Sequence, residues 1–219
     1  MPLDNPLYDD PELASAYAEV TRENLHNARY ERPAVRELLD GVHGLDVLDA
    51  GCAAGEHALW LAEHGAHVTA IDVSAPMTEL ARRRLGARGT ALCADLAAPL
   101  PFADASFDCI LSSMALHYLA SWETPLREFR RTLRAGGRLI VSTHHPQLTT
   151  NERDPYHEVH LVREAWSGFG SSAVPVQFYH RPMQRIVDDI VAAGFELRRF
   201  IEPPLAPGTR PFFLIIEAR

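Results

Sequence analysis

Residues 47–65, VLDAGCAAGEHALWLAEHG, decide the fold of this chain. The stretch opens with an apolar strand ending in Asp49, turns through small residues from Gly51 to Gly55, and continues as a helical run to Gly65. Glycine permits backbone conformations that are closed to other residues, and it leaves room for a ligand to approach closely. The N–H groups at a helix start favour anions, but Asp49 beside them would repel a phosphate. The stretch therefore predicts a partly cationic ligand with several hydrogen-bond donors, such as a zwitterionic nucleoside.

Strands and helices alternate along the chain on both sides of this stretch. We expect strands at residues 47–49, 68–72, 91–95, 107–112 and 138–143, and helices at 11–28, 33–39, 56–64, 75–85 and 122–135. Leu13, Ala16, Tyr17, Val20 and Leu25 are the expected buried positions of the first helix. Such alternation predicts an α/β fold with a doubly wound, mainly parallel sheet and helices on both faces.

The C-terminal part breaks the alternation. A helix expected at residues 183–193 is followed by two strands, 195–201 and 212–217, which only a ten-residue, proline-rich loop separates. This loop is too short for a helical crossover, so the last strand should pair antiparallel with the strand before it. Before that helix, residues 145–181 show no clear period and are expected to be a long loop at the ligand-binding edge of the sheet.

Composition limits the kinds of partner. The chain has 219 residues, enough for one domain, and a formal net charge of −8, which argues against nucleic acid as the main partner. We expect no membrane partner, because no stretch approaches the roughly 20 apolar residues of a membrane span. The cysteines, Cys52, Cys93 and Cys109, have no metal-ligand spacing, so a reduced, cytoplasmic protein is expected.

Several ordered motifs resemble a known family. The segments VLDAGCAAG, VTAIDVS, ADLAAPLPFADASFDCILSS and LRAGGRLIVS, with the closing pair of strands, resemble the class I S-adenosylmethionine-dependent methyltransferases, the small-molecule branch in particular. The resemblance covers roughly residues 15–217. It implies a Rossmann-like sheet of seven strands whose last strand is antiparallel. It also implies a single domain, residues 1–219, with residues 1–40 as a helical lid and residues 145–181 capping the substrate.

The resemblance also implies a site for S-adenosyl-L-methionine. Asp49 would lie near the amino group, Asp72 would accept both ribose hydroxyls, and Asp95 would accept from the adenine amino group. The full set of implied cofactor contacts is Asp49, Gly51, Gly55, Asp72, Val73, Met77, Asp95, Leu96, Ser112 and, from the lid helix, Tyr17. The commonest turn of the family has glycine where this chain has Ala53, a change that we expect to be tolerated.

Histidines are the candidate proton acceptors, because imidazole is a natural base near neutral pH. His117 follows the fourth strand, His144 and His145 follow the fifth, and His180 ends the segment without a period. Methyl transfer from a sulfonium often needs only alignment, so the need for a base stays open. No histidine pair has the spacing of a helix-borne metal site, and no catalytic metal is expected.

The sequence thus predicts an enzyme that transfers a methyl group to an oxygen, nitrogen or carbon atom of a small molecule. A protein substrate is one alternative, and a binding module without activity is another. A nicotinamide-dependent oxidoreductase is less favoured, because its glycine fingerprint would require glycine at Ala53 and Glu56. The acceptor and the choice between monomer and homodimer are left open.

Overall fold

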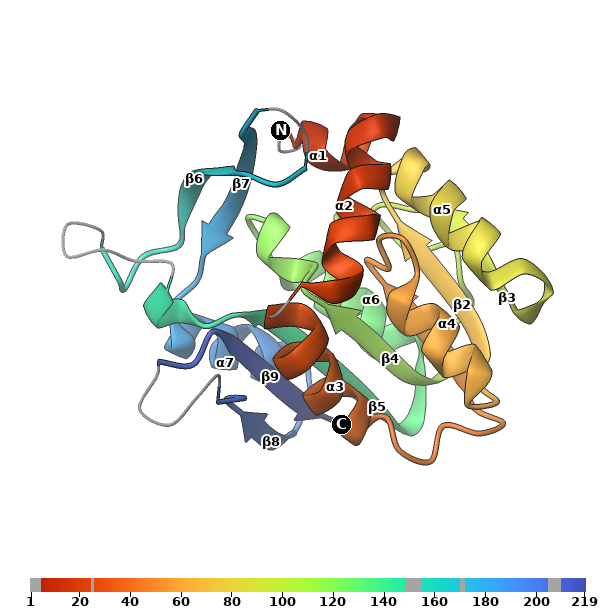
Figure 1. Ribbon diagram of the computed structural model, residues 1–219. Helices are drawn as coiled ribbons and strands as arrows, with labels where there is room; N and C mark the ends of the chain where they lie inside the picture. Colours follow the sequence, from red (N-terminus) through yellow and green to blue (C-terminus); the bar gives the residue numbers. More distant parts are fainter. Residues whose placement is uncertain (1–4, 25, 149–154, 170–171, 205–209) are drawn as a thin grey trace.

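A seven-stranded sheet forms the centre of the protein (Figure 1). The computed structural model describes residues 5–24, 26–148, 155–169, 172–204 and 210–219. The strands lie in the order β3-β2-β1-β4-β5-β9-β8. Their bounds are β1 Asp46–Ala50, β2 His67–Asp72, β3 Gly89–Cys93, β4 Phe107–Ser113, β5 Leu133–His144, β8 Leu197–Ile201 and β9 Phe213–Ala218.

Strand directions match the doubly wound prediction. The pairs β1·β2, β1·β4, β2·β3 and β4·β5 are parallel. Strand β9 lies between β5 and β8 and runs antiparallel to both. The seven-stranded sheet with an antiparallel last strand is therefore confirmed, and so is the antiparallel pairing of the two C-terminal strands.

Helices cover both faces of the sheet and bury two apolar clusters (Figure 1). On one face lie α3, α4 and α5, whose side chains pack on β1 and β2. On the other face, α6 and α7 pack Trp122, Phe129 and Ile190 against β4 and β5. The bounds are α3 Arg32–Leu38, α4 Glu56–Glu63, α5 Ala75–Leu85, α6 Glu123–Thr132 and α7 Met183–Ala192. No helix in the described residues is both long and apolar enough to span a membrane.

Two helix ends show how local chemistry competes with pairing between strands. Ser74 caps α5 as expected, since its side chain accepts a hydrogen bond from the N–H of Met77. The expected extension of α6 to residue 135 is wrong. Leu133 is extended and pairs with Phe107, so β5 begins where the periodic apolar pattern predicted one more helical turn.

The expectation of a long loop at residues 145–181 is also wrong. Strands β6 (His160–Trp166) and β7 (Val174–His180) form a separate antiparallel hairpin. Side chains at every second position of β7, from Val174 to His180, are buried. In the connection between the two strands Gly168 has φ +101°, a conformation that favours glycine, and residue 170 lies outside the described residues.

The N-terminal segment lies beside this hairpin and over the glycine turn (Figure 1). It consists of α1 (Pro6–Asp9), α2 (Pro11–Glu23) and a π-helical turn, η1 (Asn27–Glu31). The buried positions of α2 are Ala14, Ala18 and Thr21, while Val20 is 38% exposed. The expected buried face is therefore only partly correct: Leu13 and Tyr17 are partly buried against the hairpin, whereas Val20 is exposed. The fully buried positions lie one residue further along, where the small Ala14 and Ala18 let α2 approach Ala54 and Met77 closely. Leu25 lies outside the described residues.

Candidate active site

Two adjoining cavities lie at the C-terminal ends of the parallel strands. The first, here called the acidic cavity, has a volume of about 620 Å³, and its wall includes the acids Asp9, Glu31, Asp49, Glu56, Asp72 and Asp95. The second, here called the aromatic cavity, has a volume of about 430 Å³, and its wall includes Tyr17, Tyr118, Trp166, Phe169, Phe178, Phe212 and Phe213. Ligands of open α/β sheets bind at this edge.

The glycine turn forms part of the acidic cavity. Gly51 has φ +85°, and a Cβ at this position would overlap the Cβ of Ala115. The N–H groups of Gly51 and Cys52 both donate to the carbonyl of Ile71 at 2.8 and 2.9 Å. The turn is therefore fixed against β2, and its bare backbone at Gly51 lies in the cavity wall.

Asp72 holds the turn and the start of α5 together. One carboxylate oxygen accepts from the N–H of Ala53 at 2.8 Å, and the other accepts from the N–H of Ser74 at 2.9 Å. Ala53 has φ +45°, a left-handed conformation that is strained for a residue with a Cβ. Its hydrogen bond to Asp72 offsets part of that strain.

Gly55 has a different setting from Gly51. It has φ +80°, it does not line either cavity, and a Cβ there would come within 3.1 Å of the Cβ of Ala81. Gly55 therefore lets α4 and α5 pack closely, and its position gives no support to the expected contact with a cofactor.

Asp49 is buried and incompletely satisfied. It is 1% exposed, and its Oδ2 has no hydrogen-bond partner among the described residues. Burial, together with the nearby Asp72, raises the pKa of Asp49 to about 6, although His57 acts in the opposite direction. A cationic donor in the cavity would satisfy this oxygen.

Sequence reasoning missed a second buried acid, Glu31. Its carboxylate accepts from the hydroxyls of Ser113 at 2.7 Å and Ser142 at 2.5 Å, and it lies 3.5 Å from Nε2 of His57. Burial acts to raise the pKa of Glu31, but His57 and the two serines outweigh it and hold the pKa below its ordinary value. Glu31 ends a π-helical turn, a feature often found at functional sites, yet its long-range partners leave no local signal.

The remaining expected cofactor contacts fall into two groups. Five of them line the acidic cavity: Tyr17, Val73, Met77, Asp95 and Leu96. Ser112 does not, because it is fully buried within β4 and donates its hydroxyl to the carbonyl of Ala50 at 3.1 Å. The cavity wall therefore does not support the expected cofactor contact of Ser112, whereas the next residue, Ser113, does line the cavity.

The same five side chains line both cavities: Tyr17, Thr21, Asn27, Met114 and Tyr118. Met114 follows β4 directly and has φ +51°, a conformation that strains a residue with a long side chain. Two hydrogen bonds from its N–H to Ser142, at 3.0 and 3.1 Å, hold it there. Strain of this kind collects at functional sites, and here it lies where the two cavities meet.

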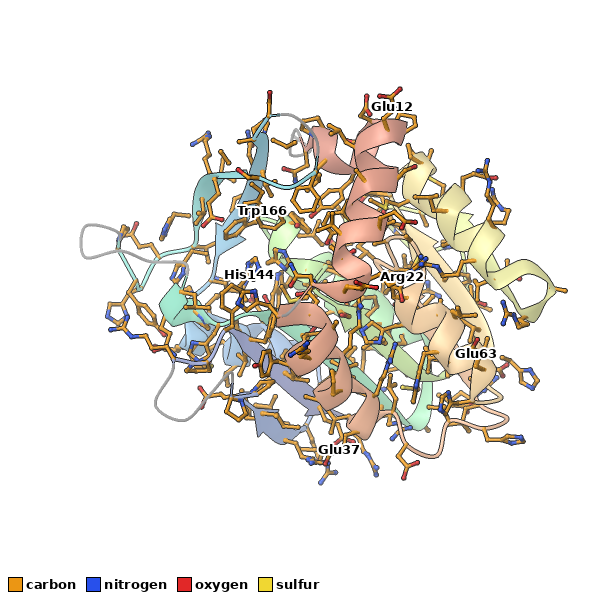
Figure 2. All side chains as sticks on the ribbon, viewed as in Figure 1. Glu12, Arg22, Glu37, Glu63, His144 and Trp166 are labelled. Carbon is orange, nitrogen blue, oxygen red and sulfur yellow. The ribbon has the colours of Figure 1, made fainter. Side chains whose placement is uncertain are left out.

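Two of the four candidate histidines line the aromatic cavity. The rings of His117 and His144 lie 4.4 Å apart between centroids. Neither nitrogen of His117, nor Nδ1 of His144, has a hydrogen-bond partner among the described residues. Burial lowers the pKa of His144 to about 4, and burial together with His144 lowers the pKa of His117 well below its ordinary value. His144 ends β5 of the sheet, and Trp166, labelled with it in Figure 2, belongs to the hairpin strand β6; both line the aromatic cavity.

The other two candidates lie outside both cavities. His145 pairs through Nε2 with Glu202 at 2.8 Å. Nε2 of His180 contacts the carbonyl of Tyr156 at 2.8 Å, and its ring stacks on His160. Both rings therefore hold the ends of the hairpin segment rather than facing a ligand. Among the described residues, no group of three His, Cys, Asp or Glu side chains is arranged to hold a metal ion.

Comparison with known proteins identifies the family of this chain. A model described as a methyltransferase domain matches residues 48–141. A solved S-adenosylmethionine-dependent methyltransferase from Mesorhizobium loti has a TM-score of 0.72 at 26% identity, over 88% of this chain and 99% of that one. The chain belongs to the class I S-adenosylmethionine-dependent methyltransferases. It is a methyltransferase, and its cofactor is S-adenosylmethionine.

Two curated methyltransferases match part of the chain. The malonyl-[acyl-carrier protein] O-methyltransferase of Erwinia pyrifoliae is 34% identical over 78% of this chain, and the match covers 62% of that enzyme. The demethylmenaquinone methyltransferase of Clavibacter sepedonicus is 36% identical over 59% of this chain, and the match covers 54% of that enzyme. The chain therefore spans little more than half the length of these relatives.

The N-terminal segment of this methyltransferase forms a roof joined to three elements. Both polar atoms of the Asn5 side chain bond to the backbone of Gln177 in β7, at 2.7 and 3.0 Å. The Tyr8 hydroxyl lies 2.5 Å from that of Tyr118, and the Tyr8 carbonyl accepts from Ser74 at 2.6 Å. The roof thus contacts the hairpin, the helical turn η3 (Leu116–Tyr118) that follows β4, and the start of α5.

Proposed function

We propose that the acidic cavity binds S-adenosylmethionine, that the aromatic cavity binds a small-molecule acceptor, and that methyl transfer takes place where they meet. The observation that carries this proposal is the shared wall of Tyr17, Thr21, Asn27, Met114 and Tyr118. Two ligands held on either side of Met114 are close enough for direct transfer, and proximity of this kind can lower a barrier by roughly 7–11 kcal/mol.

The residues of the acidic cavity fit the cofactor. The unpartnered Oδ2 of Asp49 suits an ammonium group, the bare backbone at Gly51 admits a close ligand, and the cavity acids suit a cationic sulfonium. Asp72 faces the cavity with both oxygens already holding backbone N–H groups, and each oxygen has a further lone pair for a ribose hydroxyl. When bound, S-adenosylmethionine supplies an activated methyl group, whose bond to sulfur breaks with both electrons returning to sulfur.

His117 and His144 are the side chains that we assign to the acceptor's proton. As the new bond to the methyl carbon forms, an acceptor oxygen or nitrogen becomes strongly acidic and must lose its proton. A neutral imidazole with a free lone pair can take that proton even when its pKa is low. The same low pKa then favours release of the proton to water.

Two alternative functions, nicotinamide-dependent redox chemistry and methylation of a protein, are less favoured. An unpaired Glu56 at the start of α4 would repel the pyrophosphate of a nicotinamide cofactor, but Glu56 forms ion pairs with Arg22 and Arg84, so its charge is a weak argument against such a cofactor. Family membership is the stronger argument. A protein acceptor would have to insert a side chain beneath the roof and the hairpin that it contacts. An acceptor small enough to be enclosed is therefore favoured.

Replacing Asp72 with alanine should weaken binding of S-adenosylhomocysteine about ten- to a hundredfold in calorimetry. Hydrogen bonds to a charged group contribute roughly 1.5–3 kcal/mol, and the variant loses a charged acceptor for two hydroxyls. Because Asp72 also holds the turn at Ala53, the 2′-deoxy analogue separates the two effects. Wild-type protein should bind this analogue more weakly than S-adenosylhomocysteine, whereas the variant should bind the two equally. Continued discrimination by the variant would place the ribose elsewhere.

Replacing His117 or His144 with glutamine should leave the affinity for S-adenosylhomocysteine intact and lower turnover of the true acceptor at least tenfold, about 1.4 kcal/mol in the barrier. His145→Gln is the matched control, since that ring lies outside both cavities, and it should retain turnover. In wild-type protein saturated with S-adenosylmethionine, the rate should stay level on acidification past pH 6.5 and fall only towards pH 4, because burial keeps the pKa of His144 near 4. Equal turnover in all three variants would remove the histidines from the reaction.

A further inference from the structure

We propose that the methyl acceptor is a neutral, flat aromatic or heteroaromatic molecule with a weakly acidic O–H or N–H, bound in the aromatic cavity with that group facing His117 and His144. This inference rests on the proposed function, because it assigns the acceptor to one of the two cavities described above. It goes further by stating the chemistry that the cavity selects.

The walls of the aromatic cavity favour a ligand with a flat, apolar ring system. Phe178 from the hairpin and Phe212 beside β9 lie edge-on to the ring of His144, at 4.9 and 6.4 Å between centroids. The ring of His26 stacks on Phe212 at 4.6 Å. Aromatic side chains set at such angles favour another ring placed face-on or edge-on among them. The volume of about 430 Å³ falls within the roughly 300–1,000 Å³ of small-molecule pockets.

Two histidines beside the aromatic rings of the cavity favour an acceptor with an O–H or N–H group. His117 is buried and His144 partly buried, their rings lie close together and are neutral near pH 7, and three of their ring nitrogens are buried without a partner among the described residues. Leaving buried polar atoms unpaired costs roughly 1–3 kcal/mol for each group. Each neutral imidazole offers one N–H donor and one acceptor nitrogen. A ligand hydroxyl, which can donate to one ring and accept from the other, would satisfy both His117 and His144.

The charge of the cavity excludes a carboxylate or phosphate acceptor. No arginine is present among the described residues of its wall, and the chain contains no lysine. The one acid there, Glu164, accepts from Nε1 of Trp166 at 2.7 Å and adds negative charge. An anionic acceptor would therefore be buried without a counter-charge and beside a like charge, which is strongly unfavourable.

A binding experiment tests the acceptor class separately from the proposed function. Calorimetry with S-adenosylhomocysteine first reports on the cofactor, and its failure would count against the proposed function itself. Protein saturated with S-adenosylhomocysteine is then titrated with 2-naphthol, 8-hydroxyquinoline and malonyl-N-acetylcysteamine. We expect at least one aromatic probe to bind ten times or more tightly than the malonyl thioester. Absence of binding by both aromatic probes, or equal or tighter binding of the malonyl thioester, would overturn the inference.

A variant locates the bound probe. Glu164 lies in β6 in the wall of the aromatic cavity and pairs with the buried Val176, so its side chain is on the face of the hairpin that carries Trp166 and Phe178. Glu164→Trp should fill part of the cavity, weaken binding of the aromatic probe at least tenfold and leave the affinity for S-adenosylhomocysteine unchanged. Arg163→Trp, at the neighbouring position on the opposite face of the strand and outside the cavity wall, is the matched control and should bind both as wild type does. Unchanged probe binding in Glu164→Trp would overturn the assignment to this cavity.

Discussion

Replacing Gly51 with alanine should lower the free energy of unfolding by about 2–4 kcal/mol and reduce binding of S-adenosylhomocysteine at least a hundredfold. Two causes add at this position. The φ of +85° is strained for any residue with a Cβ, and the new methyl group would overlap the Cβ of Ala115. Relieving that overlap moves the turn away from β2, and the cavity wall moves with it. Denaturant unfolding and calorimetry measure the two losses.

Two further variants divide this loss into its parts. Gly41 has φ +74°, and no atom lies within 4 Å of the place that a Cβ would take, so Gly41→Ala should show the conformational strain alone, about 1 kcal/mol. Adding Ala115→Gly to Gly51→Ala removes the overlap and should restore stability to the level of Gly41→Ala. A double variant as unstable as Gly51→Ala would mean that the overlap with Ala115 is not the cause.

Features set by neighbouring residues were predictable from sequence. The turn at Gly51, the cap at Ser74 and the acids at the ends of β1 and β2 each depend on a few adjacent positions. The antiparallel direction of β9 followed from the short loop before it, because such a loop cannot support a crossover. The order of these local features along the chain also carried the family resemblance.

Features made by distant partners were not predictable in the same way. Glu31 gains its role from Ser113 and Ser142, which lie far away in sequence. The hairpin of β6 and β7 places charged residues on an exposed face, so its alternation is weak in sequence although seven residue pairs form it. His180 shares the buried face of β7 with Phe178, yet it lines neither cavity, because it lies at the end of the strand against Tyr156 and His160.

Replacing Asp49 with asparagine should stabilise the folded protein and weaken its cofactor binding. An acid whose pKa rises from 3.8 to about 6 on folding costs about 3 kcal/mol when it is ionised, at 1.36 kcal/mol per pH unit. Asparagine removes that cost but leaves a buried amide, so we expect a gain of about 1–3 kcal/mol in the free energy of unfolding at pH 7.5. Asp188→Asn, at an exposed position of α7, is the control and should change stability little.

The pH dependence fixes the cause of that gain. Between pH 3.8 and about 6 the folded state holds the Asp49 proton more tightly than the unfolded state, so this group's contribution to stability falls as pH rises through that window. The difference in free energy of unfolding between Asp49→Asn and wild type should therefore be small below pH 4, grow up to about pH 6 and stay level above it.

Cofactor binding also depends on the ionisation of Asp49, because an ammonium group beside Asp49 favours its ionised form. Wild-type protein should release about half a proton per S-adenosylhomocysteine bound at pH 6, measured by calorimetry in buffers of different ionisation enthalpy, and close to none at pH 8. Asp49→Asn should release none at either pH and bind at least tenfold more weakly. Equal affinity in the variant would move the ammonium to Glu31, the other buried acid of the cavity.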